Sequence, residues 1–209
     1  MRVTPEAQWL DCHSYQQTII GNINQIEHFL FRSSTASYIL VLEKDTVLSA
    51  LFDADFHVRT GCILITAKGM PDLATRAFLH RLHRSLPTLP VLGLVDWNPD
   101  GVGIVSVYKH GSAALESRRF VMPGLQWLGM RYDQLAGVDA SRLQGLSRRD
   151  QTKIQTLTEG VLRDELTWAA ELAKMEEFQQ KAVIEAVFSV QGADFVDQVE
   201  NMLTNFHAG

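Results

Sequence analysis

Three short apolar runs constrain the fold of this chain more than any other feature. They are Tyr38 to Leu42, Cys62 to Thr66 and Val91 to Val95, and in each the apolar residues are continuous rather than alternating. Continuous runs of strand length are typical of strands that are covered on both faces, as in a parallel sheet. Helical patterns over residues 45–52 and 72–86 separate the runs, so we expect right-handed β-α-β crossovers. The sequence therefore predicts an α/β fold with a parallel sheet and helices on both faces.

Further elements are expected beyond the third run. Val102 to Tyr108 is predicted to form another helix, and Leu125 to Gly129 a late strand. A helix is expected to begin near Ser147. Good helix formers then extend from Leu166 to Val190, and an amphipathic stretch covers Phe195 to Leu203. We therefore expect a helical C-terminal extension.

Length and composition suit a single domain. The 209 residues are 46% apolar and 21% charged, which allows a sizeable core. We divide them into an N-terminal segment that packs on the core (1–34), an α/β core (35–130) and a helical extension of the same domain (131–209). Cys12 and Cys62 are the only cysteines, and no apolar run is long enough to span a membrane. We therefore expect an intracellular protein, neither disulfide-stabilised nor membrane-bound.

Charge is distributed unevenly along the chain. The formal net charge of −5 speaks against a protein that coats nucleic acid without specificity, because such proteins are strongly basic. Residues 1–150 contain 15 basic and 14 acidic side chains, a net charge of +1, whereas residues 151–209 contain 4 and 10, a net charge of −6. The acidity lies in the C-terminal part, which we expect to face away from any nucleic acid.

Each apolar run is followed by charged residues. Glu43 follows the first run and Asp96 the third, and the carboxyl ends of neighbouring parallel strands lie at one edge of a sheet, about 5 Å apart. Converging carboxylates repel one another unless a divalent cation neutralises them, and oxygen ligands favour Mg²⁺ or Mn²⁺. The plainer alternative is that such acids cap helices or are solvated, which suffices for Asp45 and Asp72 at expected helix starts.

Three motifs, in this order, resemble the Toprim domain of the topoisomerase VI A subunit family. They are Val41 to Asp45, Ile65 to Arg76 and Asp96 to Gly101, of which the second is the most specific. Three other stretches are similar to family landmarks, namely Val107 to Ser112, Gln126 to Gly129 and Lys181 to Ala186. The likeness covers most of the chain and leans to the eukaryotic meiotic double-strand-break transesterases and their plant paralogues.

The resemblance implies a Rossmann-like Toprim fold and a part in DNA cleavage. In this family a tyrosine on a winged-helix domain attacks a phosphodiester and leaves a 5′-phosphotyrosyl link, while the Toprim domain holds Mg²⁺ (or Mn²⁺) beside the phosphate. By resemblance, Glu43, Asp96 and Asn98 are catalytic and bind the metal, and Asp100 is a further candidate ligand. We expect the carboxylate of Asp96 to be solvated, so that removing it leaves the fold intact.

Two departures from the family pattern affect this expectation. Asn98 stands where many members have an aspartate, and its neutral carbonyl oxygen should bind the cation more weakly, although some eukaryotic branches share it. The winged-helix domain precedes the Toprim domain in the family, and residues 1–37 are too short for one. Tyr15, the only tyrosine before the first run, lacks the basic flanks expected of the nucleophile. We therefore expect the isolated chain to be inactive in DNA cleavage.

A few side chains near the strand ends are candidates for DNA contact. Lys68, after the second run, and Lys109, before a Gly-Ser turn, are predicted to contact the DNA backbone. Met70 is either an apolar wedge in the minor groove or a loop residue that closes the core. The arginines of the helix over 72–86 are predicted instead to form a solvated face. They are Arg76, Arg81 and Arg84.

The sequence is thus interpreted as the metal-binding domain of a type IIB topoisomerase-like enzyme that forms meiotic double-strand breaks and initiates homologous recombination. Its expected location is the nucleus, on chromosomes. The expected partners are double-stranded DNA, a second copy of the chain, meiotic accessory proteins and a topoisomerase VI B-like subunit. The alternative is a non-catalytic module, with a weakened metal site, that binds DNA and holds a dimer and its partners together. A different Toprim enzyme, such as a primase or a recombination nuclease, is disfavoured by the motif from Lys68 to Arg76.

Overall fold

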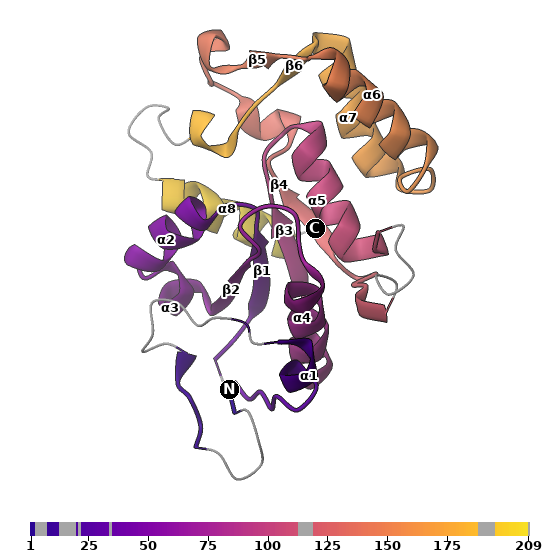
Figure 1. Ribbon diagram of the computed structural model, residues 1–209. Coiled ribbons are helices and arrows are strands. Elements are labelled where there is room, and N and C mark those ends of the chain that lie inside the picture. The colour runs from indigo at the N-terminus through magenta and orange to yellow at the C-terminus, as the bar shows by residue number, and fades with distance from the viewer. Residues whose placement is uncertain are drawn as a thin grey trace. The chain divides into compact units, whose positions relative to one another are not determined.

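Four strands form the sheet that the apolar runs predict. In the computed structural model they are β1 (Tyr38–Leu42), β2 (Cys62–Thr66), β3 (Val91–Leu94) and β4 (Gln126–Gly129), in the order β2-β1-β3-β4 (Figure 1). The structure describes residues 1–2, 8–12, 20, 22–33, 35–112, 119–187 and 195–208. All four strands lie at the predicted positions to within a residue at either end, and the α/β fold is confirmed.

The pairing of β1 with β2 shows why their sequences are continuous apolar runs. The two strands are parallel, with Tyr38 opposite Cys62 and Leu42 opposite Thr66. All five residues of β1 are buried, as expected of a strand that is covered on both faces. In β2, at the end of the strand order, only Cys62 and Ile65 are fully buried. The lower burial of β2 relative to β1 therefore agrees with its place at the end of the strand order.

The chain divides into two compact units, which are described in turn. The first consists of Met1–Leu92 with Val107–Gln126, and the second of Gly93–Ser106 with Trp127–Gly209. Helix α5 (Pro99–His110) begins in the second unit and ends in the first.

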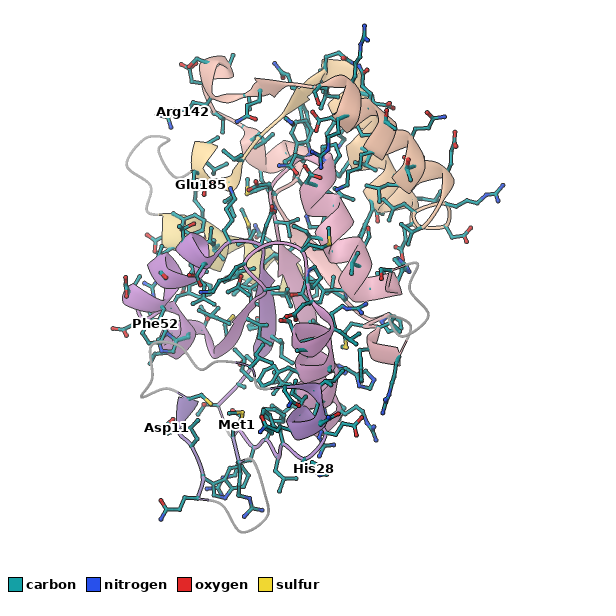
Figure 2. All side chains as sticks on the ribbon, viewed as in Figure 1. Met1, Asp11, His28, Phe52, Arg142 and Glu185 are labelled. Carbon is teal, nitrogen blue, oxygen red and sulfur yellow. The ribbon has the colours of Figure 1, made fainter. Side chains whose placement is uncertain are left out.

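Short helices accompany β1 and β2 in the first unit. They are α1 (Ile23–Ile26), α2 (Asp45–Asp53), α3 (Phe56–Thr60) and α4 (Leu73–Ser85). Helices α2 and α3 pack against β2, and side chains fill the space around these strands (Figure 2). Helix α4 begins after Asp72, whose Oδ1 accepts a hydrogen bond from the Thr75 N–H at 2.7 Å. Asp72 is therefore a helix cap, as the plainer alternative expected.

Apolar side chains of the N-terminal segment pack against α4. Ile26 and Phe29 are buried in one cluster with Ala77 of α4. The rings of Phe29, Phe31 and Phe78 meet edge to face at centroid distances of 5.3–6.2 Å, the geometry that aromatic quadrupoles favour. This segment therefore contributes to the core of the first unit.

The second unit combines helices with a small antiparallel sheet. Its main elements are α6 (Arg148–Glu159), α7 (Leu166–Phe178), α8 (Phe195–Ala208), β5 (Gln144–Gly145) and β6 (Gln180–Lys181). Ser147 and Asp150 form a capping box at the start of α6, which explains why the helix begins where the sequence predicted. Within the described part of the chain, no helix combines the length and apolar character needed to cross a bilayer.

The helix predicted from Leu166 to Val190 is wrong over residues 179–187, and the rest of the predicted range, 188–190, lies outside the described residues. Helix α7 ends at Phe178, and Gln179 adopts a left-handed conformation with φ of 51°. The following residues form strand pairs instead, as β6 pairs with β5 and the Ala182 N–H donates to the Trp97 carbonyl at 2.9 Å. These long-range hydrogen bonds override the good helix propensity of the segment.

Candidate functional site

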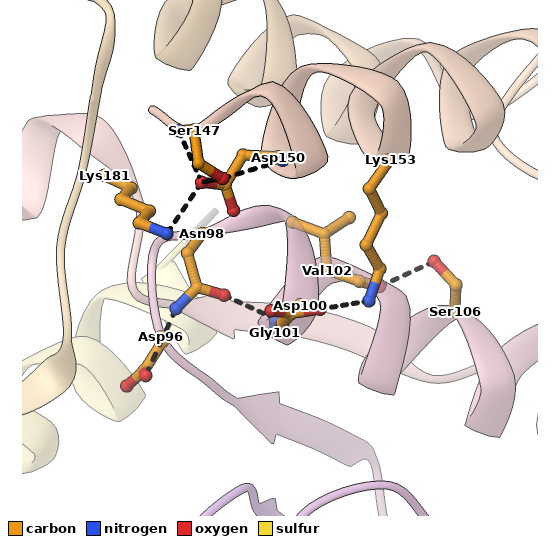
Figure 3. A network of polar contacts seen from close by, with 10 residues as sticks. All are labelled: Asp96, Asn98, Asp100, Gly101, Val102, Ser106, Ser147, Asp150, Lys153 and Lys181. Atoms are coloured by element: carbon orange, nitrogen blue, oxygen red, sulfur yellow. Dashed lines mark hydrogen bonds and ion pairs between the residues drawn. The ribbon is translucent and has the colours of Figure 1, made fainter. Parts of the chain in front are cut away.

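Asp96 lies two residues after the end of β3, and its carboxylate is buried, with 3% of the residue exposed. Its Oδ1 accepts a hydrogen bond from the Ile184 N–H at 2.9 Å. Its Oδ2 accepts one from Asn98 Nδ2 at 3.3 Å, and Figure 3 shows this second contact. These donors occupy two of the roughly four acceptor positions of a carboxylate and fix its direction. The expectation of a solvated Asp96 is therefore wrong, because a segment distant in sequence folds over it.

Asn98 is the N-terminal cap of α5. Its Oδ1 accepts a hydrogen bond from the Gly101 N–H at 2.7 Å, and its carbonyl oxygen accepts one from the Val102 N–H at 3.1 Å. The side-chain orientation follows from its partners, because Gly101 requires an acceptor and Asp96 a donor. Asn98 thus presents an N–H group to Asp96 at the point where an aspartate would present a second negative charge.

The third candidate ligand that follows β3, Asp100, is directed toward α6. Its Oδ1 forms an ion pair with Lys153 Nζ, and the two side chains are 52% and 28% exposed. Figure 3 shows Asp100 and Lys153 facing each other, away from the side chain of Asp96. Asp100 therefore serves the contact between α5 and α6 in this structure.

A partly buried ion pair holds the segment that covers Asp96. Asp150 Oδ2 accepts hydrogen bonds from Ser147 Oγ at 2.6 Å and from Lys181 Nζ at 2.8 Å. Burial alone raises the pKa of the Asp150 carboxyl, but the hydrogen bonds from Lys181 and Ser147 outweigh it and lower the pKa to about 2. Lys181 immediately precedes the residues that hydrogen-bond to Trp97 and Asp96. The pair therefore anchors that segment to the start of α6.

Two residues that the sequence analysis did not single out also hold the loop. Trp97 is fully buried, and its indole Nε1 donates to Glu171 Oε2 on α7 at 3.0 Å. Nothing in the sequence marks Glu171, which lies within an ordinary amphipathic helix. The stretch from Lys181 to Ala186 did carry a signal, because it is similar to a family landmark. Its physical role, as a donor of backbone N–H groups, becomes visible only in the fold.

In the first unit, Glu43 and Lys68 follow β1 and β2. Glu43 is half-buried at the end of β1. Lys68 is exposed, adopts a left-handed conformation with φ of 59°, and places its Nζ 3.1 Å from Asp45 Oδ2. Asp45 is the first residue of α2 and lies one position after its N-terminal cap, Lys44. Met70 is 55% exposed, so it does not close the core.

The other basic candidates of the first unit differ in exposure. Lys109 is half-buried in the last turn of α5. Arg84 is exposed, as expected, but Arg76 is only 4% exposed, and Arg81 Nε donates to the Phe29 carbonyl at 2.9 Å. The solvated face predicted for α4 is therefore wrong at Arg76, because α4 is packed on several sides.

Among the described residues, no group of three or more His, Cys, Asp or Glu side chains lies close enough together to hold a metal. The set predicted from the sequence consists of the carboxylates of Glu43, Asp96 and Asp100 and the amide of Asn98. Glu43 belongs to the first unit and Asp96 to the second. Tyr15 lies outside the described residues.

Comparison with known proteins identifies the family. A family model for the Toprim domain of the topoisomerase 6 A subunit and Spo11 matches residues 38–200. The chain belongs to this family. It is 41% identical over 198 residues to the meiotic recombination protein SPO11-2 of Oryza sativa subsp. indica, with 92% of this chain and 50% of the relative covered.

Two less similar relatives are named as a topoisomerase subunit and as a meiotic recombination protein. The A subunit of DNA topoisomerase 6 from Arabidopsis thaliana is 37% identical over 171 residues, which cover 79% of this chain and 40% of the relative. The meiotic recombination protein SPO11 of Mus musculus is 30% identical over 194 residues, covering 90% and 48%. The chain spans about half the length of the curated relatives it matches.

The Toprim match confirms the resemblance carried by the three motifs. It begins at Tyr38, the first residue of β1, and its range includes the candidate residues Glu43, Lys68 and Asp96. The parallel sheet of this Topo6A/Spo11-family chain therefore lies within the matched range. The roles of individual residues remain predictions.

Proposed function

We propose that this Toprim chain is the metal-binding part of a DNA transesterase that forms double-strand breaks in meiosis and initiates recombination. One observation carries the proposal: Asp96, a buried carboxylate at the carboxyl end of β3, is held in one direction by the Ile184 N–H. Ligand sites of open α/β sheets lie at this end of the strands. The rice relative is named a meiotic recombination protein, which favours the meiotic branch.

Glu43, Asp96 and Asn98 are the proposed ligands of Mg²⁺ or Mn²⁺. Their oxygen donors suit these hard cations, and the oriented carboxylate of Asp96 fits the role directly. Asn98 uses its Oδ1 to cap α5, so its contribution should be weaker. Asp100 forms an ion pair with Lys153, so it should contribute less to metal binding than the other three residues. The part of Glu43 is inferred from its position after β1 and from the family motif.

The chemistry of the site follows from charge. A bound divalent cation supplies positive charge that offsets the negative charge of a scissile phosphate. The side chains proposed to hold the DNA beside it are Lys68, Met70 and Lys109. We assign the attack on phosphorus, which leaves a 5′-phosphotyrosyl link, to a tyrosine of a winged-helix domain, as the family resemblance implies. The proposed assembly is a homodimer with a topoisomerase VI B-like subunit on nuclear chromosomes.

Calorimetric titration of the chain with Mg²⁺ and with Mn²⁺ tests the proposed ligands. We expect saturable binding that is lost in Asp96→Asn and in Glu43→Gln. Asp164→Asn is the matched control, since Asp164 is an exposed carboxylate in the turn between α6 and α7. No saturable binding in the unsubstituted chain, or equal binding in all three variants, would overturn the metal site.

A second function is favoured by one observation, the Asn98 N–H group that donates to Asp96. A neutral donor at this position stabilises the carboxylate without a cation, as in a non-catalytic module that binds DNA and holds partners together. The two functions differ in their response to metal. DNA binding by the chain, measured with Mg²⁺ and with EDTA, should depend on the cation in the enzymatic case and be unchanged in the other.

A further inference from the structure

We propose that Glu171 of α7 is a positioning residue for Asp96 and acts through the indole of Trp97. The inference rests on the proposed function, in which Asp96 is a cation ligand. All the residues involved belong to the second unit. They form a continuous path of hydrogen bonds and peptide links from α7 to the carboxylate that follows β3.

Glu171 is a buried carboxylate with three hydrogen-bond donors around it. Only 4% of the residue is exposed. Its Oε2 accepts from Trp97 Nε1 at 3.0 Å and from the Tyr132 N–H at 2.8 Å, and its Oε1 accepts from Lys174 Nζ at 2.7 Å. Burial alone raises the pKa of Glu171, but the hydrogen bonds from Lys174, Tyr132 and Trp97 outweigh it and keep the pKa below its ordinary value. The residue is therefore ionised and geometrically fixed.

Trp97 is held at both its side chain and its main chain. The indole donates to Glu171, and the ring lies 5.6 Å from the ring of Tyr132 between centroids. The carbonyl oxygen of Trp97 accepts from the Ala182 N–H at 2.9 Å. A tryptophan fixed at these points cannot rotate without breaking hydrogen bonds inside a dry core, where each unsatisfied polar group is costly.

The orientation of Trp97 is passed to its neighbour Asp96. The same extended segment donates twice, from the Ala182 N–H to the Trp97 carbonyl and from the Ile184 N–H to Asp96 Oδ1. A tilt of the Trp97 peptide would therefore disturb both bonds. Groups that hydrogen-bond to metal ligands orient them, and their loss commonly weakens metal affinity by about 10- to 100-fold.

A carboxylate at position 171 is needed, because no neutral isostere serves all its donors. Glutamine keeps the shape but has one oxygen, and its NH₂ group would face either Lys174 Nζ or the pair of N–H donors. We therefore expect Glu171→Gln to fold and to hold Trp97 less firmly. Trp97→Phe removes the indole donor together with part of the ring volume, and keeps an aromatic ring in the core.

The test compares these two variants with Glu177→Gln, a matched control at an exposed position of the same helix. Amide hydrogen exchange at Ile184 is measured without metal, and exchange at Ile154 of α6 reports opening of the unit as a whole. We expect several-fold faster exchange at Ile184 in both variants, with Ile154 and the control unchanged. In Mg²⁺ titration, both variants should bind about 10-fold more weakly.

The outcomes separate this inference from the proposed function. Unchanged exchange at Ile184 in both variants would overturn the positioning role of Glu171, regardless of the result of the Mg²⁺ titration. Equal acceleration at Ile184 and Ile154 would also overturn it, because Glu171 would then only stabilise the fold. A chain that binds no cation at all, yet shows selective acceleration at Ile184, would refute the metal site and leave the orientation of Asp96 by Glu171 established.

Discussion

The loops after β2 and β3 occupy the same position in an α/β fold but are held in different ways. After β2, the Lys68 N–H donates to Thr66 Oγ1 at 3.0 Å and Asp72 caps its own helix, two local hydrogen bonds. The ion pair of Lys68 with Asp45 lies at the surface. After β3, the partners are distant in sequence, with Ile184 88 residues from Asp96 and Glu171 74 residues from Trp97. The first loop exposes its side chains, whereas the second buries them.

The way in which each loop is held indicates which function it can have. A loop with exposed side chains and few long-range contacts opens at low cost and adapts to a large, irregular ligand. A loop fixed by buried long-range hydrogen bonds holds a side chain in one direction, as a metal ligand requires. The first therefore suits the DNA contact that we propose for Lys68 and Met70, and the second suits the ligand role that we propose for Asp96.

The largest expected effect distinguishes Gly69, in the loop after β2, from Gly101, which lies in the first turn of α5 and packs against the loop after β3. A β-carbon on Gly101 would overlap the backbone of Asp96, whereas one on Gly69, at φ of 120°, would meet no atom within 4 Å. We expect Gly101→Ala to lower the free energy of unfolding by about 3 kcal/mol, from overpacking. Gly69→Ala should cost about 1 kcal/mol, from backbone strain alone. Urea unfolding measures both, and equal losses would contradict the difference between the loops.

Acid should weaken the ion pair of Asp150 with Lys181, which anchors the segment that covers Asp96. The pKa of Asp150 is lowered to about 2 from an ordinary value of 3.8, so the folded state binds this proton more weakly than the unfolded state. The stabilisation, about 2 kcal/mol, is present above about pH 4 and is lost as the pH falls toward 2. Unfolding measured across this range should lose that component in Asp150→Asn and in Lys181→Met. An unaltered pH profile in both variants would refute the anchor.

A second carboxylate in the loop after β3 should make the stability of the folded chain depend on a bound cation. In Asn98→Asp, an oxygen replaces the N–H donor that lies 3.3 Å from Asp96 Oδ2, so the two charges repel without metal. We expect about 1 kcal/mol of destabilisation in EDTA and about 10-fold tighter Mg²⁺ binding. Thermal unfolding with and without Mg²⁺ measures both. Unchanged affinity would place position 98 outside the metal site.

The smallest expected effect concerns the loop after β2. The ion pair of Lys68 with Asp45 is exposed, so Lys68→Ala should change stability by less than about 1 kcal/mol. It should weaken DNA binding and reduce the salt dependence by about one charge, as for a lost phosphate contact. Arg84→Ala, an exposed arginine at the end of α4, is the matched control. Equal losses in both variants would show a diffuse charge effect instead of a specific contact.

Local signals explain what could be predicted about the fold. The strands were found because a run such as Tyr38–Leu42 is buried on both faces. The starts of α4 and α6 follow from short side chains, Asp72 and Ser147, that cap the next turn. The prediction failed after Phe178, where a sequence with good helix propensity pairs with distant backbone instead.

The candidate site was predicted in part. Glu43, Asp96 and Asn98 are predicted as its members from their positions after strands and from family motifs, and their roles stay predictions. Their surroundings were not predicted, because the burial of Asp96, the capping role of Asn98 and the ion pair of Asp100 depend on partners that no local pattern encodes. Glu171 was missed for the same reason.

The sequence by itself determined the α/β class, the strand positions, most helix starts and the Topo6A/Spo11 family. Those features depend on periodicity, caps and motifs, which act over a few residues. Only the tertiary structure decided that Asp96 and Arg76 are buried and that Trp97 donates a hydrogen bond to Glu171. The physical reason is that burial and long-range hydrogen bonds depend on which segments meet, and that is fixed only when the whole chain folds.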